Sequence, residues 1–174
     1  LKRFSENQEK KRQLFREYFS LKPDEIAIGI VGRVVPVKNH QLFLKAIQFV
    51  TENTTKKIKA FIIGDGESII SIKEHALTLG IRFNDQKDLT QFDEHISGKH
   101  NIMPENINSG NLVFASWIRN IDYAFAGLDI ITLSSLNEGT PVSIIEAQAA
   151  SKPVVSTPVG GVENIVIPGE TALL

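Results

Sequence analysis

Apolar residues follow two patterns along this chain. Short uninterrupted runs rich in Ile, Val and Phe predict buried strands, whereas apolar residues that recur every three or four positions predict helices. The runs lie at residues 26–31, 60–63, 112–115, 129–133 and 154–156. The helical pattern covers residues 4–19, 40–50, 69–79, 122–126 and 141–150, and a further short helix is expected near residue 162. Strands and helices therefore alternate over most of the chain.

This alternation predicts the fold class. Continuous apolar strands separated by helices are typical of a parallel sheet whose two faces are both covered. We therefore expect an α/β fold, with a Rossmann-like parallel sheet of at least five strands and helices on both faces. Ligands of such folds bind beyond the carboxyl ends of the strands, so the loops that follow strands are the places to search for chemistry.

The domain organisation follows from length and from breaks in the pattern. The 174 residues are enough for one domain with a full core, and we expect a single domain over residues 1–174. Residues 1–25 are interpreted as a linker helix and a turn, and the polar residues 84–111 as an insertion with one short helix at 89–96. The chain begins with Leu rather than Met and stops inside an apolar run, which we interpret as a fragment of a longer protein.

Composition narrows the range of partners. The apolar fraction of 42% and the charged fraction of 22% are ordinary for a globular protein, and the net charge of −1 gives no reason to expect nucleic acid as a partner. The chain has no cysteine and its four histidines lack metal-ligand spacing, so we expect neither a metal nor a cofactor. No apolar run reaches the roughly 20 residues that a transmembrane helix needs. We expect a cytoplasmic protein, with any membrane association arising outside this chain.

The loop after the first predicted strand carries two cations. Arg33 and Lys38 lie in residues 32–39, just before a predicted helix whose amino terminus carries partial positive charge. A guanidinium can bind two phosphate oxygens at once and an ammonium acts as a point charge, so this loop suits a diphosphate. The alternative is a pair of solvated charges at a loop edge.

A second candidate segment runs from Glu138 to Glu146. Thr140 is expected to be the N-cap of the following helix and Pro141 its first residue. Glu146 then lies on an otherwise apolar helix, where a carboxylate is costly unless it has partners. Sugar hydroxyls would be suitable donors to it. The alternative is a buried carboxylate satisfied by the backbone or by a nearby cation.

Two glycine-rich turns follow other strands. Gly64-Asp65-Gly66-Glu67 comes after the second predicted strand, and Gly160-Gly161 after the last. Glycine pairs can turn backbone amides toward a ligand, but they also serve tight turns and close packing of segments. Both interpretations stay open for each turn.

Two single residues have competing interpretations. His40 is expected to face solvent at the start of a helix, although its position beside Lys38 would let it approach a phosphate. Trp117 follows a predicted strand, where a nucleobase could stack on it. Packing beneath the 84–111 segment is the interpretation that we favour for this side chain.

In combination, these residues resemble the group-1 glycosyltransferases. The two glutamates, eight positions apart, look like the E-x7-E motif of that family. The resemblance runs from about Ile26 to Leu174, without the 84–111 segment. The other matching residues are Gly32-Arg33 with Lys38, Gly64-Asp65-Gly66, Ser135, Pro153-Val154-Val155 and Gly160-Gly161. Three positions depart from the family pattern: Asn39, Ser116 and Ser151 stand where Gly is usual.

The resemblance implies one half of a two-domain GT-B enzyme. In this family the carboxyl-terminal domain binds the nucleotide-sugar donor and the amino-terminal domain binds the acceptor. Arg33 and Lys38 would hold the diphosphate, Glu138 would face the sugar, and Glu146 would bind the ribose hydroxyls. The implied donor-binding set is Gly32, Arg33, Lys38, Ile118, Glu138, Gly139, Thr140, Pro141, Val142 and Glu146, of which Arg33, Lys38 and Glu138 are the candidate catalytic residues.

The implied activity is transfer of a sugar from a nucleoside diphosphate with retention at the anomeric carbon. A UDP-sugar is the commonest donor in the family, and a glycan or a lipid-linked molecule would be the acceptor. The acceptor domain would belong to the part of the protein that is absent from this chain. Two alternatives remain: a module that binds nucleotide sugars without catalysis, and an epimerase or phosphorylase of the same fold.

Overall fold

A seven-stranded sheet forms the centre of the computed structural model, which describes residues 1–98 and 110–174. The strands are β1 (Glu25–Val31), β2 (Lys57–Ile63), β3 (Phe83–Gln86), β4 (Leu112–Ala115), β5 (Ile130–Leu133), β6 (Val154–Ser156) and β7 (Ala172–Leu173). Their order across the sheet is β3-β4-β2-β1-β5-β6-β7, and every neighbouring pair is parallel. The predicted α/β fold with a parallel Rossmann-like sheet is thereby confirmed.

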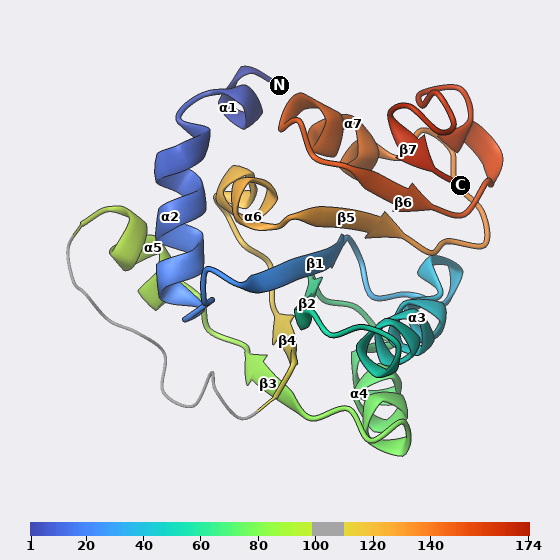
Figure 1. The fold of residues 1–174 in the computed structure, drawn as a ribbon, viewed down its shortest axis with the longest axis horizontal. Coiled ribbons are helices and arrows are strands. Elements are labelled where there is room, and N and C mark those ends of the chain that lie inside the picture. Colours follow the sequence, from blue (N-terminus) through green and yellow to red (C-terminus); the bar gives the residue numbers. More distant parts are fainter. Residues whose placement is uncertain (99–109) are drawn as a thin grey trace.

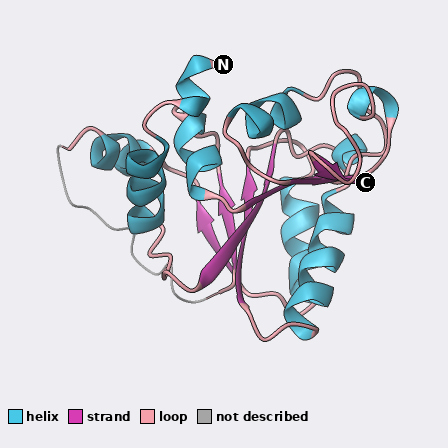
Figure 2. Cartoon of the chain, turned by 45° about the horizontal axis from the view of Figure 1, so that its top comes forward, coloured by secondary structure: helices cyan, strands magenta, loops and turns pink. Residues whose placement is uncertain are grey.

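Helices cover both faces of this sheet. They are α1 (Lys2–Ser5), α2 (Gln8–Tyr18), α3 (His40–Glu52), α4 (Ile69–Thr78), α5 (Thr90–Ile96), α6 (Ile121–Gly127) and α7 (Val142–Ala149), with short 3-10 turns at Pro36–Lys38 and Gly160–Val162. Figure 1 shows α3 and α4 side by side at one side of the sheet and α2 and α6 at the other. In Figure 2 the strands lie between the two groups of helices.

Alternate residues of the central strands enter different cores. Ile28 and Ile30 of β1 pack in the core beneath α3 and α4, whereas Ala27 and Val31 of the same strand pack in the core beneath α2, α6 and α7. Because side chains of an extended strand point to opposite faces in turn, a strand buried on both faces must be apolar throughout. The uninterrupted apolar runs of the sequence have this physical cause.

The amino-terminal segment belongs to one of these cores. The single helix expected over residues 4–19 is divided at Asn7, whose φ of 54° is left-handed. Phe15, Tyr18 and Phe19 at the end of α2 are completely buried. Phe15 lies so close to Gly127 of α6 that a β-carbon added to the glycine would be 2.1 Å from its ring. This residue pair sets the distance between α2 and α6.

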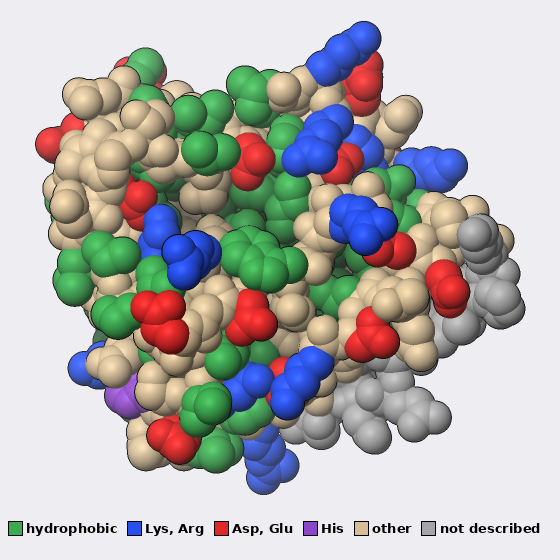
Figure 3. All heavy atoms as spheres, turned by 180° about the vertical axis from the view of Figure 1, so that it is seen from behind, with side chains coloured by type: hydrophobic (Ala, Val, Ile, Leu, Met, Phe, Trp, Pro, Cys, Tyr) green, Lys and Arg blue, Asp and Glu red, His purple; other side chains and the backbone are tan. Residues whose placement is uncertain are grey.

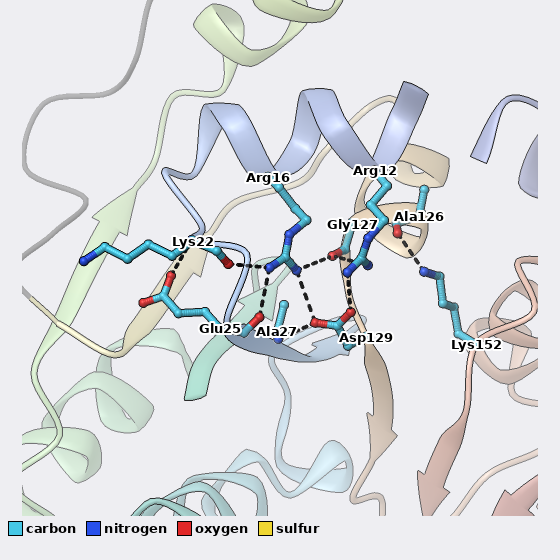
Figure 4. Close-up of polar contacts among 9 residues, drawn as sticks. All are labelled: Arg12, Arg16, Lys22, Glu25, Ala27, Ala126, Gly127, Asp129 and Lys152. Carbon is cyan, nitrogen blue, oxygen red and sulfur yellow. Dashed lines mark hydrogen bonds and ion pairs between the residues drawn. The ribbon is translucent and has the colours of Figure 1, made fainter. Parts of the chain in front are cut away.

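Ionic contacts also join α2 to the sheet. Asp129, just before β5, accepts hydrogen bonds from Arg12 at 2.7 Å and Arg16 at 3.2 Å, and from the backbone N–H of Ala27 at 2.8 Å. Figure 4 shows the two arginine side chains extending from α2 to this carboxylate. Burial alone would raise the pKa of the Asp129 carboxyl, but the Ala27 N–H and the two guanidinium groups together lower it.

The polar segment 84–111 differs from the prediction. Its first residues belong to β3, which pairs with β4 from Phe83 opposite Leu112 to Gln86 opposite Ala115. The pattern did not reveal this strand because β3 is at the edge of the sheet, where polar residues such as Asp85 are tolerated. The expected helix at 89–96 is present as α5. The remainder of the expected insertion, residues 99–109, lies outside the described residues.

Candidate functional site

A cleft of about 610 Å³ opens at the carboxyl end of the sheet. The loops after β1, β4 and β5 surround it, together with the first part of α7. It is lined by Val31, Gly32, Arg33, Val35, Val37, Lys38, Trp117, Ile118, Ile121, Glu138, Thr140, Pro141, Val142, Ser143 and Glu146. The fold thus brings all of the implied donor-binding residues except Gly139 to one cleft. Gly139 lies between two residues of its lining.

The two glycine turns, at residues 64–66 and 160–161, pack against the loops that line the cleft. A β-carbon at Gly64 would be 2.0 Å from the carbonyl oxygen of Gly32, and one at Gly160 would be 1.9 Å from that of Glu138. Backbone hydrogen bonds fix the same contacts, from Val34 N–H to Asp65 at 2.9 Å and from Gly161 N–H to Glu138 at 3.1 Å. Only glycine lets these loops approach so closely. Of the two interpretations of each turn, the structure therefore favours close packing.

Lys38 and Glu138 meet inside the cleft, although they are 100 residues apart in the sequence. The Lys38 Nζ lies 2.5 Å from Glu138 Oε1, and the hydroxyl of Ser135 donates to the same oxygen at 2.5 Å. The Glu138 side chain is only 9% exposed and that of Lys38 24%. Solvent screens such an enclosed pair far less than a surface ion pair. The two charges that the sequence assigned to different parts of a donor are therefore in direct contact.

The backbone just after Lys38 has an unusual conformation. Asn39 has φ 48° and ψ 49°, which is the left-handed geometry that Asn tolerates better than most residues. Asn39 can therefore form the turn into α3 at the position where the family pattern usually has Gly. Ser151, after α7, is also left-handed, with φ 53°.

Arg33 is the more accessible cation of the site. Its guanidinium lies 3.8 Å from the carboxylate of Glu67, and both side chains are about two-thirds exposed. An ion pair with this separation and exposure contributes little. The guanidinium can therefore leave Glu67 for a stronger anion. The sequence pattern did not identify Glu67 as its partner, because the two residues lie on different loops.

Glu146 projects into the cleft from α7. Its carboxylate is half-buried, and it makes no hydrogen bond or ion pair with any residue that the structure describes. Burial raises the pKa of this carboxyl, against the opposing charge of Arg3. The described contacts therefore do not support the alternative interpretation, in which groups of the protein already satisfy this carboxylate. Glu146 is available to an external hydrogen-bond donor.

Three expectations about single residues are wrong. His40, the first residue of α3, is 2% exposed rather than solvent-facing; burial and the nearby Lys38 lower its pKa to about 4. Trp117 is 53% exposed and lines the cleft instead of packing inside. The helix α7 begins at Val142, so Pro141 is its N-cap and no side chain caps it; the expected capping by Thr140 does not occur.

The charges on the surface are mixed in sign. On the face drawn in Figure 3, lysine and arginine side chains are interspersed with aspartate and glutamate, and apolar side chains lie between them. Among the described residues, no helix is long and apolar enough to cross a bilayer.

Comparison with known proteins identifies the family. The family described as glycosyl transferases group 1 matches residues 25–174. Among curated proteins, the chain is 27% identical over 161 residues to the UDP-Gal:alpha-D-GlcNAc-diphosphoundecaprenol alpha-1,3-galactosyltransferase of Escherichia coli, and 26% identical over 164 residues to the D-inositol 3-phosphate glycosyltransferase of Paenarthrobacter aurescens. These alignments cover 92% and 94% of this chain but only 35% of either relative.

Solved structures have the same fold. HepE of Anabaena, crystallised in complex with UDP, superimposes with a TM-score of 0.71 over 98% of this chain and 40% of its own, at 16% identity. The C-terminal domain of the group 1 glycosyltransferase LpcC of Francisella tularensis gives a TM-score of 0.62 over 91% of this chain and 70% of its own, at 21% identity. The family match covers the whole sheet and every loop of the cleft, and the chain therefore belongs to the group 1 glycosyltransferases.

Proposed function

We propose that the cleft binds a nucleoside diphosphate sugar and that the protein transfers this sugar to an acceptor with retention at the anomeric carbon. The observation that carries the proposal is the arrangement of charges in one cleft: two cations, an enclosed carboxylate and a second carboxylate without a partner among the described residues. Such a cleft has complementary groups for phosphates and for sugar hydroxyls.

Each part of the donor can be assigned to a group of residues in the cleft. Arg33 and Lys38 both line the cleft. A diphosphate would replace Glu67 as the partner of Arg33, and it would accept a further hydrogen bond from Lys38, whose ammonium has three donors. Glu146 would accept hydrogen bonds from ribose hydroxyls, because an ionised carboxylate is an acceptor only. Trp117 and Ile118, from the loop after β4, also line the cleft, and they would offer apolar surface to a base. Glu138 would face the transferred sugar.

The chemical task of such a site is to stabilise a leaving group. Negative charge develops on the diphosphate as the sugar becomes cationic, and Lys38 and Arg33 would stabilise that charge through preorganised electrostatics. The proposal includes no metal ion, because these two cations would take that role. The acceptor, which we propose to be a glycan or a lipid-linked molecule, would be bound by a second domain outside this chain.

UDP is the nucleotide that we propose. The support comes from two relatives: the curated Escherichia coli enzyme is a UDP-Gal-dependent galactosyltransferase by name, and structures of HepE contain UDP and UDP-glucose. The relatives do not determine the sugar for this chain, which spans about a third of their length.

Calorimetry with UDP-, GDP- and ADP-sugars, each with and without a chelator, tests the proposal. We expect one nucleotide series to bind, with an affinity that chelation leaves unchanged. An affinity that collapses on chelation would mean that a divalent ion carries the phosphate charge. If no nucleoside diphosphate sugar bound, the proposed function would be wrong. Binding without transfer by the full-length protein would instead favour a binding module, and turnover dependent on orthophosphate would favour a phosphorylase.

A further inference from the structure

Two adjacent buried serines lie directly behind the cleft. Ser134 and Ser135 follow the last residue of β5 and are 6% and 1% exposed. Neither belongs to the lining of the cleft. Because successive side chains of an extended segment point in opposite directions, the two hydroxyls reach different parts of the site.

The Ser134 hydroxyl holds the loop of Lys38. Its Oγ lies 3.0 Å from the carbonyl oxygen of Lys38 and 3.0 Å from that of Asn39. These two residues form the turn at which the backbone enters its left-handed conformation before α3. The hydroxyl therefore fixes the point from which the Lys38 side chain leaves the backbone.

The Ser135 hydroxyl holds the other charged group. It donates to Glu138 Oε1 at 2.5 Å, the same oxygen that Lys38 Nζ approaches. Ser135 is itself fixed, because the hydroxyl of Thr157, just after β6, donates to its carbonyl oxygen at 2.7 Å. Among the described residues, every contact of the Glu138 carboxylate falls on Oε1. Its second oxygen remains available to a substrate.

We propose that Ser134 and Ser135 are positioning residues, which hold the side chains of Lys38 and Glu138 at fixed positions relative to each other for the transfer reaction. The inference rests on the proposed function, and it adds two residues that do not touch the donor. A glutamate side chain has several rotatable bonds, so a hydrogen bond from a rigid, buried hydroxyl restricts which oxygen faces the cleft. Restricting a charged group before the substrate binds is how a site avoids reorganisation during reaction.

The first test compares three variants of the full-length protein. Ser135→Ala should lower kcat about tenfold while leaving the Kd for UDP within about twofold, because Glu138 faces the sugar and not the nucleotide. Ser134→Ala should weaken UDP binding by about three- to tenfold, because it acts through Lys38. Thr132→Val is the matched control: it removes a hydroxyl of β5 that bonds to the Gly29 carbonyl at 3.1 Å, away from both charged groups. It should leave kcat and Kd unchanged.

A double-mutant cycle separates positioning from a general structural role. The background for the cycle is Glu138→Ala, because a glutamine would still accept the Ser135 hydrogen bond. If Ser135 acts through Glu138, Ser135→Ala should lower kcat less than about twofold in that background, because coupled residues are not additive. A full tenfold loss in that background, or an unchanged kcat in Ser135→Ala alone, would overturn the proposal.

The cycle also distinguishes this inference from the proposed function. If the wild-type protein bound no nucleoside diphosphate and transferred no sugar, the proposed function would fail and a role in transfer would fail with it. The free energies of unfolding of the four proteins in the cycle, which are the wild type, the two single variants and the double variant, need no substrate. Non-additive values would then still support the Ser135–Glu138 contact, whereas additive values would overturn that too.

Discussion

The charged residues of the cleft differ in how firmly the protein holds them. Glu138 is enclosed and shares one oxygen between Lys38 and Ser135, whereas Arg33 is largely exposed and has only a distant partner in Glu67. Glu146 has no partner among the described residues. The enclosed pair is preformed, and the other two side chains are available to a ligand.

Glu146 should make nucleotide binding dependent on pH. Its pKa is raised above the ordinary value of 4.5 by burial, and only the ionised carboxylate is a full acceptor for ribose hydroxyls. Affinity for a UDP-sugar, whose diphosphate does not titrate in this range, should therefore be constant at neutral pH and fall as the pH decreases through this raised pKa. Glu146→Gln should weaken binding by about 1–2 kcal/mol at pH 7 and remove the acid-side decrease. Calorimetry from pH 4 to pH 8 measures both; identical pH profiles for the two proteins would contradict the assignment.

Lys38 and Glu138 should respond differently to substitution. Lys38→Ala removes a charge from the phosphates and leaves a nearly buried carboxylate without its counter-ion, so both UDP affinity and Tm should fall, with UDP bound about tenfold to a hundredfold more weakly. Glu138→Gln frees Lys38, so UDP should bind at least as well while transfer of the sugar decreases. The Lys38→Ala, Glu138→Gln double variant is the control and should recover Tm. Equal losses of uridine and UDP binding in Lys38→Ala would show that the residue does not act on phosphate.

At the scale of single elements, α2 is fixed by contacts of two kinds. Phe15 packs on the glycine that ends α6, and Arg12 and Arg16 bind the carboxylate that precedes β5. Both contacts join a segment from the start of the chain to elements more than 100 residues later. The helix therefore behaves as part of the domain core and not as a detachable linker.

Gly127→Ala should destabilise the domain. The added β-carbon would be 2.1 Å from the completely buried ring of Phe15, so α2 must move away from α6. Overpacking of this kind costs about 1–3 kcal/mol. Urea denaturation measures the loss. The Phe15→Leu variant supplies the control, because adding Gly127→Ala to it should cost less than it does in the wild type; an equal cost would show that the ring is not the obstacle.

Asp129→Asn should destabilise the protein by an amount that depends on pH. The folded protein lowers the pKa of this carboxyl below its ordinary value of 3.8, so its stabilising contribution is complete above that value and disappears as the pH falls through the folded pKa. The variant should be about 2 kcal/mol less stable at pH 7, and the difference should shrink below about pH 4. Urea denaturation at several pH values tests this. Asp24→Asn, which removes an exposed pair with Lys57, should change stability little.

At the scale of the whole molecule, the parallel sheet is what assembles the site. All seven strands run the same way, so the loops after β1, β4 and β5 end at one edge and can surround one cleft. The glycine turns after β2 and β6 then support two of these loops from outside. Binding groups therefore come from segments that are distant in sequence.

A domain with a continuous sheet and a core on each face should be stable by itself. We expect residues 1–174 to fold alone and to bind nucleoside diphosphate, yet not to turn over, because the proposed acceptor domain is outside this chain. Thermal denaturation with and without UDP tests the first part, since a ligand at 100 times its Kd adds about 2.7 kcal/mol of stability. Sugar transfer by this chain alone, at the rate of the full-length protein, would contradict the second part.

The sequence by itself determined the fold class and most of the groups around the cleft. Burial on both faces explains the continuous apolar runs at residues 26–31 of β1 and 60–63 of β2, which are a local property that the sequence reveals. The sequence pattern did not reveal the strands that are not buried on both faces: β3 is polar because it is an edge strand, and β7 has only two residues. The charged loops after strands were also recognisable, because a parallel sheet gathers them at one edge.

Only the tertiary structure decided how these groups are paired. The contact of Lys38 with Glu138, the burial of His40 and the exposure of Trp117 depend on which segments meet across the sheet. The same is true of the glycines, because a residue that permits close approach does not reveal in the sequence which backbone approaches it. Strand order and register set these long-range distances, and no local pattern of residues records them.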